Sequence, residues 1–404
     1  MKILVLNAGS SSVKYQLVIP EEAKLLAKGV VERIGLSGAM LTHEALSKPP
    51  VKLSGEILDH KAAIEYVLSI LLSRNHGVIK NKDEIGAVGH RVVHGGEVFR
   101  ESVLISDEVI REMTRCIDFA PLHNPPNLKG IAAGKALLPN VPQVAVIDTA
   151  FHQSMPAHAY MYGIPYVLYK RHGIRRYGFH GTSHRYVAER AADLMNKSIK
   201  ELKIITCHLG SGSSVAAIKH GKSIDTSMGF TPLEGLLMGT RTGDMDPAII
   251  LHIMAKEQLT GGEMNTMLNK HSGVLGISGL SSDMREIEDN YDTHERARLA
   301  MDIFVYRIKK YIGSYSAAMG GVDAIVFTAG VGENSSLVRE LTCKELNFMG
   351  IQLDEKINRE TRKAEAIITQ TDSLVKVLVI PTNEELVIAK DTAKIVRELE
   401  TQTA

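Results

Sequence analysis

The sequence predicts an α/β protein built from two similar domains, and three observations support that class. Strand patterns alternate with helical patterns along the chain, as in proteins whose sheets are covered by helices. A strand–turn–strand pattern at 2–19 is repeated at 203–225. The two copies lie about 200 residues apart, which is too far for a solenoid repeat and suits a duplicated domain. A duplicated chain is expected to have a cleft between its halves, a common place for ligands.

The first copy reads KILVLNAGSSSVKYQLVI, which predicts a strand, a tight turn and a second strand. The first strand is almost entirely apolar, which is typical of burial on both faces. In the second strand Val13, Tyr15 and Leu17 alternate with polar residues, the pattern of a half-buried strand. The second copy, KIITCHLGSGSSVAAIKHGKSID, aligns with the first if Gly212 is one inserted residue.

The two Gly/Ser turns have two possible functions. Neither follows the GxxxxGK[ST] pattern. Neither is expected to precede a helix, so a helix dipole cannot contribute to phosphate binding there. Each turn is then either a plain hairpin turn or an anion nest of backbone N–H groups and hydroxyls. A third glycine stretch, in AIVFTAGVGENSS, favours the nest. Taken alone, Lys14 is an exposed strand lysine and His208 a core histidine.

Helices are predicted at several places between the strands. DHKAAIEYVLSILLSRN and ERARLAMDIFVYRIKKYIGSYSAAM have apolar residues at helical spacing. Asp246 and Pro247 fit the N-cap and first position of another helix. Thr382 and Glu385 fit the capping box of a C-terminal helix, which gives Glu385 a structural role. Glu384 lies in the same first turn without that role, which leaves it open as a magnesium ligand.

Several polar residues lie at strand ends or in glycine-rich loops, where functional groups concentrate. Asp148 ends the strand pattern in VPQVAVIDTAFH. Arg91, in AVGHRVVHGGEVF, suits either bidentate binding of a carboxylate or phosphate, or an interdomain salt bridge. In the long loop GFTPLEGLLMGTRTGDMDP, Arg241 suits a charge clamp on a phosphoryl group. APLHNPPNL holds His123 in a proline-stiffened loop, either a pocket wall or a connector.

One histidine pair has the spacing of a metal motif without completing it. His180 and His184 have the i, i+4 spacing of HExxH, but Gly181 stands where that motif has its glutamate. Zinc is therefore disfavoured. A single histidine that donates to a transferring group is the preferred interpretation of His180.

Composition excludes other classes. Lys and Arg total 47 against 46 Asp and Glu, a net charge of +1 that gives no sign of a nucleic-acid or membrane-surface partner. Three widely spaced cysteines form no zinc pattern and predict reduced thiols and a cytoplasmic protein. The N-terminus lacks signal-peptide features, and no apolar run approaches the roughly 20 residues that span a membrane.

Taken together, the motifs resemble those of the acetokinase family. LNAGSSSVKY and GFTPLEGLLMGTRTGDMDP are similar to its two signature segments. The resemblance continues in order along the whole chain through GHRVVHGG, APLHNPPN, VAVIDTAFH, YGFHGTSH, HLGSGSSV, SSDMREI, FTAGVGENS and PTNEELVIA. It implies two duplicated actin-like (ribonuclease H-like) domains with nucleotide and substrate in a cleft between them. The domains would be 1–150, completed by a helix at about 386–404, and 151–385. It also implies a homodimer.

The resemblance further implies a reversible, Mg²⁺-dependent transfer of the ATP γ-phosphoryl group to acetate, giving acetyl phosphate and ADP, with Mn²⁺ able to replace Mg²⁺. Asn7 and Glu384 would hold the metal, and Asp148, as catalytic acid, would act with His180 and Arg241. Acetate would be bound by Arg91, Val93, Leu122, Phe179 and Pro232. ATP phosphates would be bound by Ser10, Ser12, Lys14, His208, Leu209, Gly210, Ser211 and Gly212. Adenosine would be bound by Asp283, Met284, Arg285, Gly330, Val331, Gly332, Glu333 and Asn334.

Physical chemistry refines the implied mechanism. Acetate is already ionised at neutral pH, so its attack on phosphorus needs no general base. The difficulty is to bring two anions together, which calls for positioning and cations and favours direct in-line transfer. Asp148 is then expected to orient magnesium through water, or Arg91, rather than to take a proton. A propionate or butyrate kinase remains an alternative, because one methylene is worth only about 1–3 kcal/mol. A more distant alternative is a non-enzymatic ATPase switch with the same fold.

Overall fold

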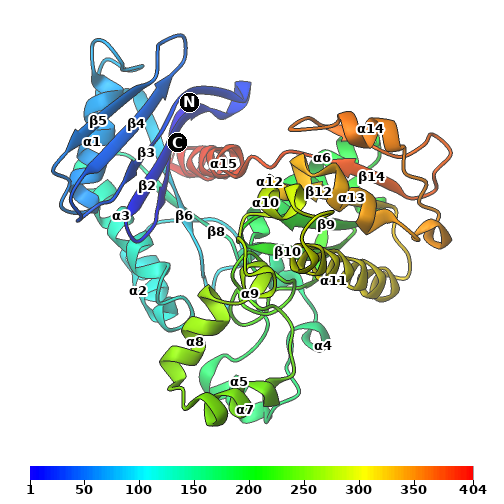
Figure 1. The fold of residues 1–404 in the computed structure, drawn as a ribbon. Helices are drawn as coiled ribbons and strands as arrows, with labels where there is room; N and C mark the ends of the chain where they lie inside the picture. The colour runs from blue at the N-terminus through cyan, green and yellow to red at the C-terminus, as the bar shows by residue number, and fades with distance from the viewer. Residues whose placement is uncertain (404) are drawn as a thin grey trace. The chain divides into compact units, whose positions relative to one another are not determined.

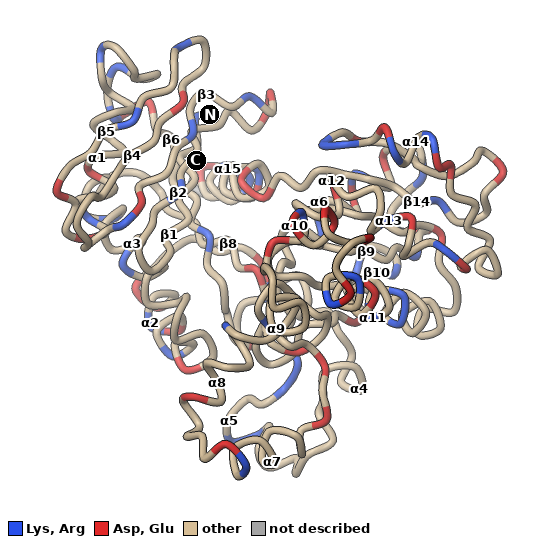
Figure 2. Tube along the Cα trace, in the orientation of Figure 1, with Lys and Arg blue, Asp and Glu red and all other residues tan. Residues whose placement is uncertain are grey.

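The computed structural model describes residues 1–403, and their contacts divide the chain into two compact units (Figure 1). The first unit comprises 1–151 with the C-terminal segment from Asn383, and the second comprises His152–Thr382. The domain limits predicted from the sequence, 150 and about 386, lie close to these limits. Lys and Arg residues are interspersed with Asp and Glu along the backbone of both units (Figure 2).

The first unit contains one mixed sheet in the strand order β5-β4-β3-β2-β1-β6-β8-β7. Strands β1 to β5 are mutually antiparallel neighbours along one side, whereas β1, β6 and β8 run parallel. The strands are β1 (Lys2–Ala8), β2 (Ser12–Ile19), β3 (Lys24–Glu32), β4 (Ala39–Ala45), β5 (Val51–Gly55), β6 (Ile85–Val92), β7 (Val103–Leu104) and β8 (Gln143–Ile147). Parallel strands place their C-terminal ends at one edge, where ligands commonly bind.

The second unit repeats this plan. Its sheet has the order β11-β10-β9-β12-β14-β13, so the series β11-β10-β9-β12-β14 matches β3-β2-β1-β6-β8 in order and direction. The strands are β9 (Lys203–Leu209), β10 (Ser213–Lys219), β11 (Lys222–Thr226), β12 (Ala324–Thr328), β13 (Ala366–Ile367) and β14 (Lys376–Val379). The predicted α/β class and the duplication are therefore confirmed.

The two Gly/Ser turns are hairpin turns, but their alignment differs from the predicted one. Ala8 pairs with Val13 in the first hairpin, and Leu209 pairs with Ser213 in the second. The second turn is therefore shorter by one residue, and the prediction that Gly212 is an insertion in it is wrong. The predicted alignment matched the serines of the two hairpins by sequence. The strand register decides which residues of one hairpin are equivalent to those of the other.

Helices cover both faces of the first sheet. Side chains alternate between faces along a strand, so Leu4 and Leu6 pack against α1 and α3, whereas Ile3 and Val5 pack against α15. Gly89 of β6 allows α15 to approach, because a Cβ there would lie 2.5 Å from the Thr392 hydroxyl. The helices are α1 (His60–Leu72), α2 (Asp107–Arg115), α3 (Asn124–Leu137) and α15 (Glu384–Thr403).

In the second unit, α11 packs Phe304, Ile308 and Ile312 into the core beneath β9 and β10. This helix is confirmed as predicted, and so is the start of α7, where the Asp246 side chain accepts from the N–H of Ala248. The helices are α4 (Ala157–Tyr160), α5 (Tyr166–His172), α6 (Gly181–Leu194), α7 (Pro247–Glu257), α8 (Gly261–Lys270), α9 (Gly273–Ser278), α10 (Met284–Asp289), α11 (Glu295–Met319), α12 (Ala329–Asn334), α13 (Ser336–Cys343) and α14 (Glu355–Glu360). Single 3₁₀ turns lie at Pro20–Glu22, Lys82–Glu84, Cys116–Phe119, Ala150–Ser154, Ile199–Glu201 and Asn347–Met349.

Two predicted loops are helical instead. The segment 330–334 after β12 forms α12, whose first residue, Ala329, has a positive φ of 63° that turns the chain out of the strand. The APLHNPPNL segment opens α3, with Pro125 and Pro126 in its first turn. Proline is tolerated there because the first helical N–H groups have no partner within the helix.

The predicted capping box at the start of α15 is wrong. The helix begins at Glu384, and the Oδ1 of Asn383 accepts from the N–H of Leu386 at 3.1 Å, so Asn383 is the cap. The N–H of Thr382 donates to Glu333 instead. Asn caps a helix as well as Thr does, and only the structure shows which of the two neighbours does so. Among the described residues, no helix is both long and apolar enough to cross a membrane.

Candidate active site

Three parallel strands bring predicted residues to one edge of the first sheet. Asn7 lies near the end of β1, Arg91 near the end of β6, and Asp148 directly follows β8. Because side chains alternate, Asn7 shares the face of Val5, and Arg91 shares the face of Ala87. Both apolar residues belong to the core beneath α15. The metal-ligand and carboxylate-binding residues predicted in this unit therefore lie on the α15 side of the sheet.

The N-terminus of α15 lies beside these residues. Its first residue, Glu384, has its Oε2 atom 3.9 Å from the Nε of Arg91. Its second residue, Glu385, lines one hollow together with Asn7 and Lys14. Asn7 and Lys14 are directly opposite in the β1–β2 register, so their side chains project from the same face.

Arg91 and Asp148 form a close ion pair. The Nη2 of Arg91 lies 2.5 Å from the Oδ2 of Asp148, whose side chain is only 2% exposed. The charge of Asp148 raises the pKa of Arg91 above its ordinary value. Both residues belong to the first unit, so this ion pair of Arg91 lies within one unit and is not the interdomain salt bridge that was one of the two alternatives for it. The buried Nε of Arg91 has no hydrogen-bond partner among the described residues, which leaves one donor for a ligand.

The carboxylate of Glu384 suits a cation. Burial is the main cause that raises its pKa to about 7, and the neighbouring charges of Asp148 and Glu385 add to it, against the opposing effect of Arg91. A cation would offset that cost. Mg²⁺ prefers oxygen ligands and keeps waters or substrate phosphates in its shell, so one carboxylate and the amide oxygen of Asn7 fit it. The residues present therefore fit magnesium.

The remaining predicted residues of this unit differ in exposure. Val93 is buried, whereas Leu122 is 72% exposed. Ser10 lies exposed at the tip of the first hairpin, and Ser12 is half-buried. The turn is held from behind by His60, whose Nε2 donates to the carbonyl of Gly9 at 2.7 Å.

In the second unit, three predicted residues surround the glycine turn. A Cβ on Gly212 would lie 3.4 Å from the Nη1 of Arg241 and 3.6 Å from the ring of His180. His180 stacks on His208, with ring centroids 4.1 Å apart and an interplanar angle of 19°. Burial lowers the pKa of Arg241. Positively charged and N–H groups thus converge on a turn that has no side chain of its own at Gly212.

A hydrogen-bond chain behind His180 sets its orientation. The Nδ1 of His180 lies 2.9 Å from the Oγ of Ser214, which lies 2.8 Å from the Nε2 of His184. The Nδ1 of His184 lies 2.6 Å from the Oγ1 of Thr206. Burial lowers the pKa of His184 well below its ordinary value, so this ring is neutral. When Ser214 donates to Nδ1 of His180, the Nε2 of His180 carries the proton and is a donor.

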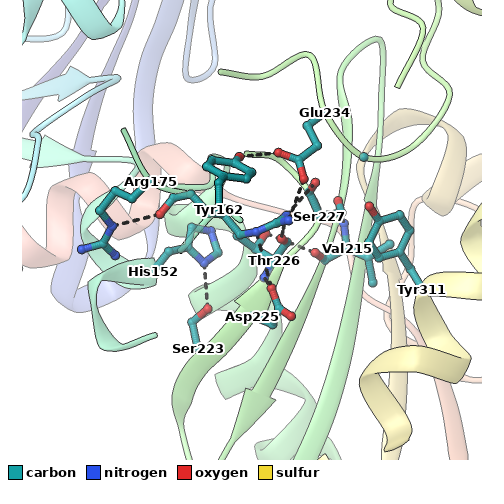
Figure 3. Close-up of polar contacts among 12 residues, drawn as sticks. His152, Tyr162, Arg175, Val215, Ser223, Asp225, Thr226, Ser227, Glu234 and Tyr311 are labelled. Atoms are coloured by element: carbon teal, nitrogen blue, oxygen red, sulfur yellow. Dashed lines mark hydrogen bonds and ion pairs between the residues drawn. The ribbon is translucent and has the colours of Figure 1, made fainter. Parts of the chain in front are cut away.

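The loop at 229–247 is held near its first end by a partly buried polar network (Figure 3). Glu234 accepts from the hydroxyl of Tyr162 and, at 2.6 Å, from the Nη2 of Arg176. Arg176 also donates to the carbonyls of Thr226 and Ser227. The network anchors the loop to the end of β11, one element away from the glycine turn.

The same loop is closed at its other end by Asp244. The Oδ1 of Asp244 accepts from the N–H of Gly235 at 2.8 Å, and its Oδ2 accepts from Tyr311 at 2.7 Å. Between these ties, the Nη1 of Arg241 donates to the carbonyl of Pro232 at 3.3 Å. Pro232 and Arg241 are therefore held next to each other.

The predicted adenosine residues flank the same turn. Gly239 of the loop donates to the carbonyl of Ser211, and a Cβ on Gly239 would lie 3.0 Å from the carbonyl of Ser282, directly before Asp283. Asp283 caps α10 and pairs with Arg285, whose hydrogen bond lowers the pKa of Asp283 to about 2. Met284 is buried. Phe179, a predicted acetate residue, is also buried, and its carbonyl accepts from the Nε2 of His152.

The second predicted adenosine segment is α12, which lies beside β9. A Cβ on Gly332 would lie 3.6 Å from the carbonyl of Cys207. The fully buried Arg339 holds this helix, because its Nη1 donates to the carbonyl of Gly332 at 2.9 Å. Burial raises the pKa of Glu333.

Sequence reasoning missed residues that hold others in place. They are Asn124, Asn127, Arg176, His184, Ser214, Glu234 and Arg339. For Asn124 and Asn127, the polar residues in the quoted HNPPN motif were the available signal. The others bind residues that lie outside their own helix or strand, and no local pattern identifies those partners.

Comparisons with known proteins agree with the geometry. Residues 2–390 match the description "Acetokinase family". The chain is 58% identical to a protein named acetate kinase from Thermoanaerobacter pseudethanolicus, over 99% of this chain and 100% of that one. It is similar in structure to Porphyromonas gingivalis acetate kinase, with a TM-score of 0.95, 52% identity and coverage of 98% and 99%. A propionate kinase from Francisella tularensis is similar at 41% identity, with a TM-score of 0.90 and the same coverage. These structures support the two-domain actin-like fold.

Proposed function

The chain belongs to the acetokinase family, and from that premise we propose that it catalyses the reversible transfer of the ATP γ-phosphoryl group to acetate. The products are acetyl phosphate and ADP. The observation that carries the proposal is the buried Nε of Arg91, which makes no hydrogen bond among the described residues and faces the carboxylate of Glu384 only at 3.9 Å, on a guanidinium already held by Asp148. A carboxylate is the planar acceptor that such a donor edge suits.

We propose that Arg91 binds the carboxylate of acetate, with Val93, Leu122, Phe179 and Pro232 around its methyl group. Acetate is ionised at neutral pH, so no residue has to remove a proton. Asp148 fixes the guanidinium of Arg91 and takes no proton, which fits an aspartate whose Oδ2 lies 2.5 Å from a guanidinium nitrogen.

Charge on the transferred group is stabilised by Arg241 and His180. Both flank the glycine turn, where backbone N–H groups suit phosphate oxygens. An arginine in this role is worth roughly 10³–10⁵ in rate. When the hydroxyl of Ser214 donates to the Nδ1 of His180, the Nε2 of His180 carries the proton and can donate to the transferred group. The burial that lowers the pKa of Arg241 leaves its charge poorly hydrated, so an anion is its natural partner.

The nucleotide is bound by the remaining residues of both units. Phosphates contact Lys14, Ser10, Ser12 and the turn at 208–212, and adenosine contacts 283–285 and 330–334. Magnesium, held by Asn7 and Glu384, supplies charge neutralisation to the phosphates when bound. We expect Mn²⁺ to replace it, because both ions accept the same oxygen ligands.

Propionate is a second candidate substrate, because a propionate kinase is among the similar structures. Apolar pockets discriminate weakly against one methylene. We expect acetate to be preferred, because the relative at 58% identity and the structure at 52% identity are both named acetate kinases. The ratio of kcat/KM for acetate, propionate and butyrate decides this point.

We also propose that the protein is a cytoplasmic homodimer. Helix α7 carries Ile249, Ile250, Leu251, Ile253 and Met254, and none of its residues is buried within the chain. An exposed apolar helix can pack against the same helix of a second copy of the chain. Light scattering should give twice the chain mass, and Leu251→Lys should reduce it. A monomer in the wild-type protein would contradict the proposal.

The central experiment mixes the protein with ATP, Mg²⁺, acetate and hydroxylamine and measures acetyl hydroxamate. We expect product that depends on acetate and on Mg²⁺, and its production should fall when Arg91 is replaced by Leu. No hydroxamate above the control without acetate would contradict a kinase and would favour an ATPase switch of the same fold.

A further inference from the structure

Two buried asparagines at the start of α3 hold the backbone of the proposed site in the first unit. Asn124 is 1% exposed and Asn127 is 4% exposed. They lie three residues apart, so they project from the same face of the first helical turn. A buried amide needs partners for both its N–H₂ and its oxygen. The partners of these two amides therefore show which segments the helix holds.

Asn124 binds one residue with both ends of its amide. Its Oδ1 accepts from the N–H of His94 at 3.2 Å, and its Nδ2 donates to the carbonyl of the same residue at 2.9 Å. This arrangement fixes the peptide backbone just beyond Val93. Its contacts are confined to the segment that the proposed function assigns to acetate.

Asn127 instead joins two segments that are far apart in the sequence. Its Oδ1 accepts from the N–H of Val93 at 3.1 Å, and its Nδ2 donates to the carbonyl of Ala8 at 2.8 Å. A backbone N–H can only donate and a carbonyl can only accept, so the partners fix the orientation of the amide. Ala8 directly follows Asn7, the proposed metal ligand.

The sequence of α3 permits this close approach. A Cβ on Gly130 would lie 2.8 Å from the Cβ of Ala8, so any larger residue would push the helix away from β1. Pro125 and Pro126, between the two asparagines, have no N–H to satisfy and fix their φ angles for the helix. The segment HNPPN is thus built to present two amides to the sheet edge.

We propose that Asn127 is a positioning residue that couples the metal side of the site to the acetate side, whereas Asn124 positions the acetate side alone. The inference rests on the proposed roles of Asn7 and Arg91. Ordering of the backbone at Val93 by bound acetate is transmitted through one amide to Ala8 and hence to Asn7. The metal side and the acetate side of the site are thereby linked within one unit by a single side chain.

The test compares Asn127→Asp with Asn124→Asp, a matched pair that makes the same change at equally buried positions of one helical turn. Each variant keeps an acceptor for its N–H partner and loses the donor to its carbonyl partner. The readouts are the Mg²⁺ concentration at half-maximal activity, the KM for acetate, and amide hydrogen exchange of the ligand-free protein in peptides covering 2–19 and 85–96.

We expect Asn127→Asp to raise the Mg²⁺ half-saturation roughly 2–10-fold, the value of one hydrogen bond, and to speed exchange within 2–19. Asn124→Asp should raise the KM for acetate and speed exchange only within 85–96. The same pattern in both variants, or no change within 2–19 for Asn127→Asp, would overturn the coupling. If Asn127→Asp does not fold, Asn127→Ala replaces it with the same expectation.

If neither Asn127 variant folds while Asn124→Asp does, the inference is also overturned, because Asn127 would then support the fold rather than the link. Circular dichroism decides that point. Hydrogen exchange needs no substrate, so it tests the coupling even if the wild-type protein forms no acetyl phosphate. That second result would contradict the proposed function alone.

Discussion

The guanidinium of Arg91 is held by Asp148, with Nη2 and Oδ2 2.5 Å apart, while its buried Nε lacks a hydrogen-bond partner among the described residues. The two residues come from neighbouring parallel strands, β6 and β8, so the pair depends on the sheet and not on local sequence. One carboxylate fixes the cation and leaves part of it for a ligand. This arrangement supports the proposal that Asp148 positions Arg91 and that Arg91 binds the carboxylate of acetate.

Asp148→Asn should therefore weaken acetate binding more than it alters the pH dependence of the reaction. The neutral amide cannot hold the guanidinium by charge, so we expect the KM for acetate to rise about tenfold, the cost of one charge-assisted hydrogen bond. The measurement is steady-state kinetics with acetate varied between pH 6 and 8. Asp148→Glu serves as the control that keeps the charge and should lose less.

Two results would contradict this role. Nearly full activity with normal magnesium dependence in Asp148→Asn would show that neither Arg91 nor the metal relies on it. Loss of the acidic limb of the pH–rate profile, the fall in activity at low pH, would instead show that Asp148 must be ionised to take a proton.

Ser214→Ala should lower kcat with little change in the KM for acetate. The hydroxyl of Ser214 lies between His180 and His184, and its removal leaves the tautomer of His180 unspecified. A preorganised donor to developing charge contributes roughly 10²–10³ in kcat, and we expect part of that factor to be lost. Ser214→Thr keeps the hydroxyl and should restore most of the rate. Equal activity of the Ala and Thr variants would contradict the role of the chain.

The sequence predicted the fold well because the fold depends on patterns that repeat. The alternation along β2 and the helical spacing of α11 are local, and the two hairpins resemble each other at a distance. The places of Arg91 and Asp148 at strand ends were predictable because apolar strand patterns end there, whereas their roles in the site stay predictions. Their pairing was left as one of two alternatives, since an arginine near glycines suits a ligand and a salt bridge equally.

Other features could not be predicted because tertiary contacts decide them. Thr382 and Asn383 are both good caps, and the start of α15 selects the second. The short α12 contains two glycines, which suggest a loop, yet Arg339 holds its carbonyl at Gly332. The HNPPN motif marks Asn127 as a polar residue of interest, but its partner Ala8 lies more than a hundred positions away, so no local window shows what it binds.

Arg339 should be required for stability and for nucleotide binding. It is fully buried, and its Nη2 donates to the carbonyls of Asn358 and Thr361 in addition to the bond from Nη1 to Gly332. Arg339→Met removes these donors and leaves buried carbonyls unpaired, so we expect a loss of about 3 kcal/mol in the free energy of unfolding. The KM for ATP should rise with it, because Gly332 lies in the proposed adenosine segment.

Arg339→Lys is the matched control, because it keeps the charge but not the planar fork of donors. It should lose almost as much stability as the methionine variant. Urea unfolding and ATP titration measure the two effects. An unchanged KM for ATP in a folded Arg339→Met protein would show that α12 does not depend on this residue.

Stability should fall in mild acid because of buried neutral histidines. Burial lowers the pKa of His90 to about 4, and its Nε2 lies 2.7 Å from the Oε1 of Gln143. The unfolded chain has the ordinary histidine pKa of about 6.5, so between these values the unfolded state takes up a proton that the folded state does not. The stabilising contribution is therefore complete above pH 6.5 and is lost as the pH falls toward 4, by up to about 3 kcal/mol.

Urea unfolding at pH 7.5, 6.0 and 5.0 tests this expectation against His90→Gln, whose amide does not titrate and can still donate to Gln143. The variant should be less stable than the wild type at pH 7.5, because Gln fits the site less well, but its stability should decline less steeply with falling pH. The difference in slope should approach one proton between pH 6 and 5. Parallel profiles for the two proteins would show that His90 is not the titrating group, and a wild-type profile that rises toward pH 5 would contradict the assigned pKa direction.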